Sequence, residues 1–169
     1  MRAQSWNTGW TFTDRPLYPG AAGRDVTLPH DAAIASDVRP DAPAGRASGY
    51  YPGGMAIYTR RFDAPASWQG QRVMVAFDGV YGTTDVCLNG HWLACHHYGY
   101  TPFAVDLTPY LYFHRPNRLE VTANNTAQPN SRWYTGTGIY RPVSLLVGPP
   151  VHIAPWGIFA HTDTLENDC

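Results

Sequence analysis

The chain has 169 residues, of which 44% are hydrophobic and 14% aromatic, and its formal net charge is −1. This length fits one domain, and this apolar content excludes a chain that is disordered throughout. The near-zero charge provides no field to attract nucleic acid or an anionic membrane, so we expect neither partner. No apolar run reaches the length of a membrane span. Met1–Trp10 has no hydrophobic signal core, which leaves the compartment open between cytoplasm and secretion from a bacterium.

The first half of the chain is rich in Gly and Pro. Residues 1–24 read as a lead-in, in which Trp6, Trp10 and Phe12 are the expected anchors. Residues 25–28 are predicted as a short strand that Pro29 ends. Residues 35–54 contain several Gly and Pro and are predicted as a long loop, and loops of that length in compact domains are often functional.

From residue 56 onward, apolar and polar residues alternate with the period of β-strands. The predicted strands are 56–63, 71–77, 83–88, 91–97, 103–107, 118–124, 139–147 with a break at Pro142, 151–153 and 157–162. Short strands separated by turns, with almost no helix, are typical of an all-β fold. We therefore predict a two-sheet antiparallel β-sandwich or jelly roll over residues 1–162. Residues 163–169 are polar and are interpreted as the start of a linker or the end of an excised piece.

The strongest local signal is the pair Asn89-Gly90, which predicts a tight hairpin turn. If the turn has two residues, Cys87 lies opposite Trp92 and Cys95 points to the other face of the sheet. A disulfide between the two cysteines is then not expected, and both are predicted to be free thiols. A longer loop would leave that question open.

Four groups of motifs follow one another along most of the chain. They are Leu28–Asp31; Gly49–Gly54 with Tyr58–Phe62; Phe77–Tyr81 with Val86–His91, Tyr98–Phe103 and Asp106–Thr108; and Gln128–Arg141. In this order they resemble the N-terminal sugar-binding domain of glycoside hydrolase family 2, the β-galactosidase and β-glucuronidase group. One position departs from the family pattern, because Ala32 stands where the family often has Trp. A second departure is the length of the loop that comes next.

The resemblance implies a galactose-binding-domain-like jelly roll that precedes an immunoglobulin-like domain and a catalytic barrel. The partners it implies are a carbohydrate, with a β-galactoside expected, and those two further domains. It also allows a homo-oligomer of the full enzyme. Asn130–Arg141 resembles the galactosidase branch more than the glucuronidase branch, and the full enzyme would work by double displacement with retention of configuration.

The candidate substrate-binding residues lie mainly in one loop. Asn, Arg and Trp side chains together offer hydrogen bonds to sugar hydroxyls and an apolar plate for the C–H face of a sugar. The candidates are Asn130, Ser131, Arg132, Trp133, Tyr134, His30, Asp31 and Tyr81. For each, a structural role is the alternative: packing for Trp133, Tyr134 and Tyr81, a local ion pair for Arg132, and turn formation for His30 and Asp31. In some relatives an acidic residue stands near the position of Ser131, so a metal contact that depends on that acid is not expected here.

The sequence provides no catalytic pair. Retaining glycosidases use two carboxyl groups about 5 Å apart, and in the resembled family both are Glu. The two Glu residues of this chain, Glu120 and Glu166, lie in a strand and in the tail. The adjacent His96 and His97 point to opposite faces of a strand and do not suit one metal ion. We therefore expect no catalytic residue, no metal, no cofactor and no activity from this chain alone.

Three hypotheses about function remain. The first is an accessory domain that supports the barrel of a family 2 glycosidase and completes its substrate pocket. The second is an independent carbohydrate-binding module. The third is a purely structural sandwich that orients neighbouring domains.

Overall fold

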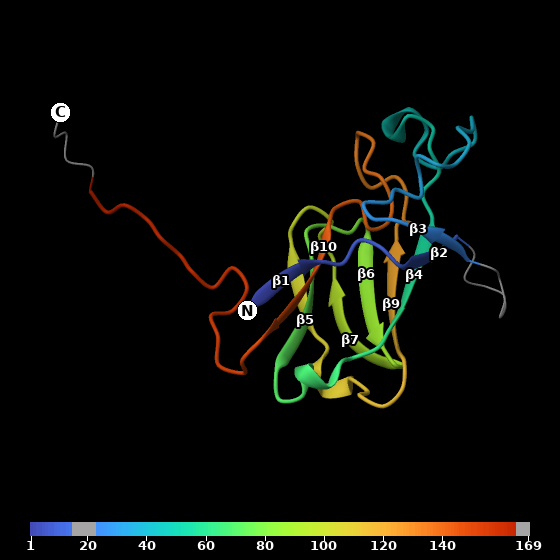
Figure 1. The fold of residues 1–169 in the computed structure, drawn as a ribbon. Coiled ribbons are helices and arrows are strands. Elements are labelled where there is room, and N and C mark those ends of the chain that lie inside the picture. The colour runs from blue at the N-terminus through green and yellow to red at the C-terminus, as the bar shows by residue number, and fades with distance from the viewer. Residues whose placement is uncertain (15–22, 165–169) are drawn as a thin grey trace.

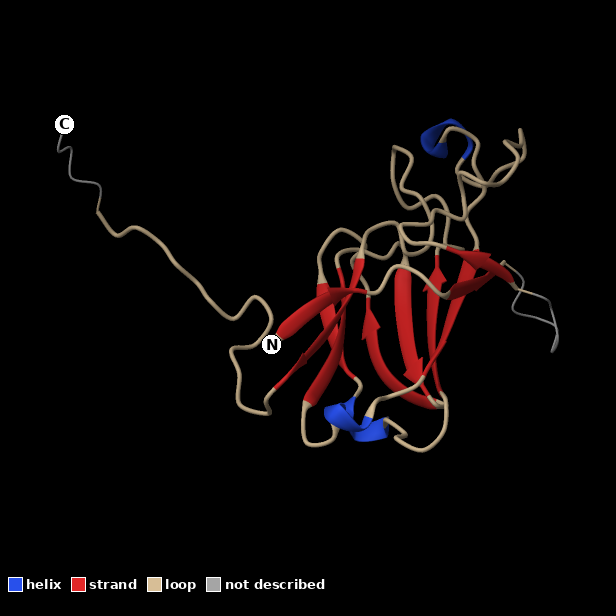
Figure 2. Cartoon of the chain, in the orientation of Figure 1, coloured by secondary structure: helices blue, strands red, loops and turns tan. Residues whose placement is uncertain are grey.

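A computed structural model of the chain describes residues 1–14 and 23–164. Over these residues ten strands form two antiparallel sheets that pack face to face (Figures 1 and 2). This confirms the predicted all-β sandwich. Within the described part of the chain the helices are 3₁₀ turns of three or four residues, and no helix there is long and apolar enough to cross a membrane.

The two sheets differ in size, with four and six strands. The smaller one has the order β1 (Arg2–Ser5), β10 (Val143–Gly148), β5 (Arg72–Phe77), β8 (Phe103–Asp106). The larger one has the order β3 (Arg24–Val26), β2 (Trp10–Thr13), β4 (Met55–Phe62), β9 (Asn117–Asn124), β6 (Thr83–Leu88), β7 (His91–His96). The 3₁₀ turns are η1 (Gly45–Ser48), η2 (Ala66–Trp68) and η3 (Thr108–Tyr110).

The core lies between the sheets and follows the predicted alternation. Val73, Val75 and Phe77 of β5 are fully buried, as expected from their spacing along one face of a strand. In the facing sheet, Tyr58 of β4 pairs with Val121 of β9 and both are fully buried. Burial of apolar surface at about 25 cal/mol per Å² makes this layer the main source of stability.

The hairpin of β6 and β7 forms at the predicted place, and Cys87 pairs with Trp92. The prediction that Cys95 points to the opposite face is wrong. A register shift between Val86 and Cys87 places Cys95 opposite Asp85, and Asp85 and Cys87 share a face because they are two residues apart. A β-bulge inserts one residue into one strand only, so it reverses the facing of the later residues in that strand. Cys87 and Cys95 are nonetheless both free thiols.

Both ends of the chain differ from the prediction. Residues 1–24 contain β1 and β2, although they were expected to be a lead-in without strands. All four β1 residues are exposed, so this edge strand has no alternation to reveal it. The expected anchors Trp6, Trp10 and Phe12 are buried, as predicted.

At the other end, the strands expected at 151–153 and 157–162 do not form. Residues 149–164 lead away from the sandwich (Figure 1), so their backbone has no neighbouring strand to pair with. Val151 is 91% exposed and Phe159 is 86% exposed. The strand expected at 139–147 begins only after Pro142, and Gly138 instead forms an isolated bridge with Tyr81. The domain boundary predicted at residue 162 stays a prediction.

Two long loops extend side by side beyond one end of the sandwich (Figure 1). One is the predicted loop over residues 35–54, whose only regular element is η1. The other lies between β9 and β10. Tyr51 of the first loop packs edge-on against Tyr134 of the second, with ring centroids 5.1 Å apart. This contact places the predicted Asn130–Tyr134 segment at a defined end of the fold.

Gly138 provides a test of this arrangement. It has φ +109°, and a Cβ there would overlap the hydroxyl of the buried Tyr58. Gly138→Ala should lower the free energy of unfolding by about 3 kcal/mol, which sums left-handed strain and overpacking. Gly70 is the matched control, since it has φ +74° but open space at its Cβ position. Gly70→Ala should cost only about 1 kcal/mol. Urea denaturation measures both, and equal losses would contradict the proposed overlap.

Candidate functional site

Asp31 anchors the loop that carries most of the candidate residues. Its Oδ1 accepts hydrogen bonds from the backbone N–H groups of Ala33 (2.9 Å) and Thr137 (3.0 Å). Its Oδ2 accepts one from the Tyr134 hydroxyl (2.6 Å). Burial, and next the bond to Asp31, raise the pKa of Tyr134. The Asp31 carboxylate thus joins two segments that lie about a hundred residues apart in the sequence. Asp31 therefore has a structural role, which was the alternative to substrate binding.

The loop is also held from inside by the buried Asn125. Its side-chain N–H groups donate to the Gly136 carbonyl (3.1 Å) and to the Thr137 hydroxyl (2.8 Å). Its Oδ1 accepts from the side-chain amides of Gln128 (2.8 Å) and Asn130 (2.6 Å). A buried amide with its partners satisfied rigidifies the segment around it.

Asn130 is an exposed residue, but both groups of its side-chain amide contact other protein groups. One of its amide N–H groups donates to Asn125, and its Oδ1 accepts from the Tyr81 hydroxyl at 3.4 Å. Ser131 likewise donates to the Trp133 carbonyl at 2.6 Å. These two candidates shape the loop, which leaves less of their hydrogen-bonding capacity for a ligand than the sequence suggested.

Arg132 and Trp133 are the outward-facing members of the segment. Arg132 is exposed and forms no ion pair or side-chain hydrogen bond with the residues that the structure describes. The Trp133 side chain is 62% exposed, and its indole N–H donates to the Tyr100 hydroxyl at 3.1 Å. A held indole with a free face, next to a free guanidinium, can stack on and hydrogen-bond a sugar.

Beside this segment lies a hollow with a volume of about 510 Å³. Asn130, Ser131, Trp133 and Tyr81 line it, so the fold brings four of the eight candidates together. Its volume lies within the range of about 300–1,000 Å³ that is usual for small-molecule sites. The hollow and the exposed Arg132 together form the candidate site.

His30 lies outside this hollow. Its ring packs against Phe12 with centroids 4.7 Å apart, and its Nδ1 lies 2.8 Å from the Tyr58 hydroxyl. Burial, and next the charge of Arg24, lower the pKa of His30. The imidazole is thus a neutral part of the packing, consistent with the structural role weighed for His30.

The sequence reading missed two residues of the hollow, Tyr98 and Tyr100. Both line it, and the Tyr100 ring packs edge-on against Tyr81 at 5.5 Å and against Tyr98 at 5.6 Å. They lie in the connection between β7 and β8, where no periodicity marks a functional side chain. The aromatic-Gly-aromatic pattern of Tyr98-Gly99-Tyr100 was the one available signal.

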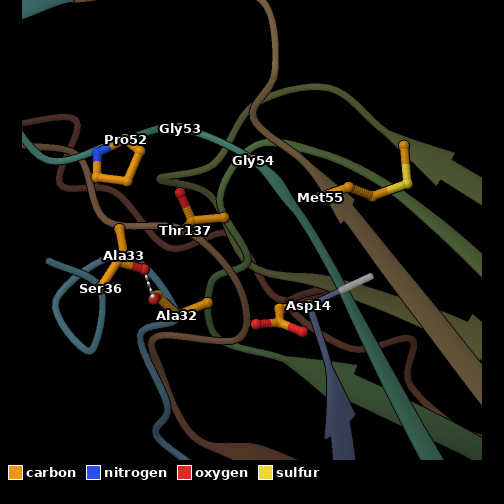
Figure 3. A pocket seen from close by; sticks show the side chains of 9 residues that line it. All are labelled: Asp14, Ala32, Ala33, Ser36, Pro52, Gly53, Gly54, Met55 and Thr137. Carbon is orange, nitrogen blue, oxygen red and sulfur yellow. Dashed lines mark hydrogen bonds between the residues drawn. The ribbon is translucent and has the colours of Figure 1, made fainter. Parts of the chain in front are cut away.

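A second, smaller hollow of about 160 Å³ lies where Ala32 replaces the usual Trp of the resembled family (Figure 3). Ala32, Ala33 and Ser36 face Pro52, Gly53 and Thr137 across it, and the Ser36 hydroxyl donates to the Ala32 carbonyl at 3.1 Å. Its walls include no aromatic side chain among the described residues. It therefore lacks the plate that a sugar ring requires, and the larger hollow is the better candidate.

The structure describes one of the two Glu residues of the chain, Glu120. Glu120 lies on the outer face of the larger sheet, opposite Thr59 in register, and forms an ion pair with Arg118. Glu166 lies outside the described residues. Across residues 1–14 and 23–164, no three His, Cys, Asp or Glu side chains come together as a metal site. His96 stacks on Phe103 with centroids 4.3 Å apart, whereas His97 lies beside Cys95.

The fold and the hollow define an antiparallel β-sandwich domain with an aromatic hollow at one loop end. Comparison with known proteins narrows that class. Residues 26–149 match the description "Glycosyl hydrolases family 2, sugar binding domain". The chain therefore belongs to this family, as the N-terminal sugar-binding domain of a family 2 glycosyl hydrolase.

The relatives agree with this membership. The chain is 42% identical to beta-galactosidase BoGH2A of Bacteroides ovatus over 95% of its own length, and 34% identical to a putative beta-glucuronidase of Formosa agariphila over 83%. A solved family 2 member from Bacteroides cellulosilyticus superposes with a TM-score of 0.86 at 33% identity, over 97% of this chain and 23% of that one. The chain spans about a fifth of the length of the B. ovatus relative and 14% of the F. agariphila one.

The anchoring role of Asp31 gives a stability prediction. Asp31→Ala removes three hydrogen bonds, two of them to backbone N–H groups. Bonds to a charged group contribute about 1.5–3 kcal/mol each, and water replaces part of them, so we expect a loss of about 3 kcal/mol in urea denaturation. Hydrogen exchange of the Thr137 amide should also quicken. The exposed Asp37 is the matched control, and an Asp37→Ala variant that loses as much stability would contradict the assignment.

His30 gives a pH prediction. Because its pKa is lowered in the folded state, the unfolded chain binds a proton more readily, and stability falls as the pH drops below about 6.5. His30→Asn retains an amide near the Tyr58 hydroxyl but cannot titrate, so its unfolding free energy should fall less between pH 7 and pH 5. His114→Asn, at an exposed site, should keep the wild-type slope. Parallel slopes for His30→Asn and wild type would refute this role.

Proposed function

We propose that this domain completes, from one side, the substrate pocket of a retaining family 2 β-galactosidase and supports its catalytic barrel. The barrel and an immunoglobulin-like domain would be its partners within one longer polypeptide. The catalytic carboxylates would come from the barrel.

The observation that carries this proposal is the way the 126–136 loop is built. Asp31 and Asn125 hold it by side-chain hydrogen bonds at both its ends, yet Arg132 and Trp133 face outward from it. A rigid loop that displays unused recognition groups is pre-organised to contact something beyond the domain. A sugar held mainly by a neighbouring domain fits this arrangement.

The choice of a β-galactoside is supported by one relative. The B. ovatus protein, at 42% identity, is named a beta-galactosidase.

The test uses the full-length enzyme that contains this chain. Arg132→Ala and Trp133→Ala should each lower kcat/KM for a β-galactoside by about 10- to 100-fold, the range for loss of one or two good contacts. Trp92→Ala is the matched control, since Trp92 is 61% exposed but lies in β7 on the outer face of the larger sheet. Its kcat/KM should stay unchanged.

Two other outcomes would replace the proposal. Unchanged kcat/KM in both loop variants, with normal thermal stability, would favour the purely structural sandwich. A barrel that keeps full activity without this domain, together with tight sugar binding by the domain alone, would favour an independent carbohydrate-binding module.

A further inference from the structure

The turn between β6 and β7 lies at the end of the sandwich away from the two long loops (Figure 1). It contains Asn89-Gly90, the one Asn-Gly pair among the 169 residues. Asn89 has φ +54° and Gly90 has φ +85°, so both residues are left-handed, as a tight hairpin turn requires. The same pair is chemically reactive, because glycine has no side chain to shield its backbone nitrogen from the amide of the preceding residue.

The structure engages every polar group of the Asn89 side chain. Its Nδ2 donates to the Tyr110 carbonyl at 2.7 Å and to Oδ1 of Asn117 at 2.9 Å. Its Oδ1 accepts from the backbone N–H of Arg118 at 2.9 Å, and its own backbone N–H donates to the Arg118 carbonyl at 2.9 Å. A reaction at this amide must first break the side-chain bonds, so it requires the hairpin to open.

Asn117, the partner of Asn89, is fully buried and has a fixed orientation. Its Oδ1 accepts from the Tyr112 backbone N–H at 2.8 Å, and its Nδ2 donates to the Tyr112 carbonyl at 2.8 Å. A flip of the Asn117 amide would bring donor to donor and acceptor to acceptor at both of these bonds. Asn117 therefore presents an acceptor to Asn89, and the side chain at position 89 must be a donor there.

We propose that Asn89 is a modification site that folding controls: the amide persists in the folded hairpin and is lost by reaction with the Gly90 nitrogen when the hairpin opens. The Gly90 nitrogen forms a bond to Cγ of Asn89, the bond from Cγ to Nδ2 breaks, and ammonia leaves with the Gly90 amide proton. Water then opens the cyclic imide at either carbonyl, which gives aspartate or isoaspartate at position 89. Water is the one co-reactant, and no group is oxidised or reduced.

Neither product fits the folded turn. An aspartate carboxylate has acceptors only, so it would face the Tyr110 carbonyl and Oδ1 of Asn117 with no proton between them. Acceptors left without a donor at a partly buried site destabilise the fold. Isoaspartate adds a methylene group to the main chain, which changes the register that pairs Leu88 with His91. The modification thus marks chains that have unfolded and impairs their refolding.

The test follows the Asn89 amide by mass-spectrometric peptide mapping, in mildly alkaline buffer with and without denaturing guanidinium chloride. Trypsin does not cut at Arg115-Pro116, so it yields the peptide 73–118, whose two side-chain amides are Asn89 and Asn117. The Asn89 amide should be lost at least about tenfold faster in the unfolded chain than in the folded one, because the reaction follows the population of the open state. Asn117, which precedes arginine, is the internal control and should be lost more slowly than Asn89 in the unfolded chain. This comparison needs no variant.

Asn89→Asp introduces one product directly. We expect its equilibrium constant for unfolding to rise by about tenfold or more, because two acceptors lose their donor. Gln69→Glu is the matched control, since it makes the same change from amide to carboxylate at an exposed side chain that has no hydrogen bond to the described residues. It should unfold like wild type.

Three results would overturn the inference: equal loss of the Asn89 amide in the folded and unfolded chain, loss of Asn117 as fast as Asn89 in the unfolded chain, or a folded Asn89→Asp that unfolds at the same denaturant concentration as wild type. If Asn89→Asp does not fold, the comparison on the wild-type chain decides. None of these outcomes bears on the proposed function, because the turn lies away from the candidate site.

Discussion

Hydrogen bonds between residues 30–32 and residues 137–139 hold the functional end of this sandwich together. The backbone N–H groups of His30 and Ala32 donate to the carbonyls of Ile139 and Thr137, each at 2.8 Å. The Asp31 carboxylate adds bonds to Thr137 and Tyr134. These bonds between residues 30–32 and 137–139 form a seam, and the bridge between Tyr81 and Gly138 extends this seam toward the larger hollow. Together with Asn125, this seam fixes the position of the loop that presents Arg132 and Trp133.

The candidate residues fall into two groups, those that bind other protein groups and those that face outward. His30, Asp31, Asn130 and Ser131 act on other protein groups, and Tyr134 is tied to Asp31. Arg132 and Trp133 are left facing outward, and the Tyr81 ring lies against the Tyr98–Tyr100 segment. Buried polar groups must be paired, whereas recognition groups must remain available, so a single loop needs both kinds of residue. In this family member, the conspicuous polar residues mostly build the site.

The candidate site lies on connecting segments rather than on the strands of the sheets. The 35–54 loop, the loop between β9 and β10 and the Tyr98–Tyr100 segment lie at one end of the sandwich, and the two sheets hold them in place. Function on loops that a scaffold positions is a common arrangement, because loops tolerate change that a packed core does not. Relatives named as beta-galactosidases and beta-glucuronidases share this scaffold.

The fold class, most central strands, the hairpin turn and the family could all be predicted from the sequence. The alternation of apolar residues and the Asn89-Gly90 turn depend only on residues that are near one another in the sequence, so both can be recognised without a structure. The sequence did not reveal β1, whose exposed residues carry no pattern, or the facing of Cys95, which a bulge reverses. It named the loop of the site but not its use of Asn130, nor Tyr98 and Tyr100. Which side chains meet, and which hydrogen-bonding groups remain free, depends on contacts between distant segments, and these contacts become known only from the three-dimensional fold.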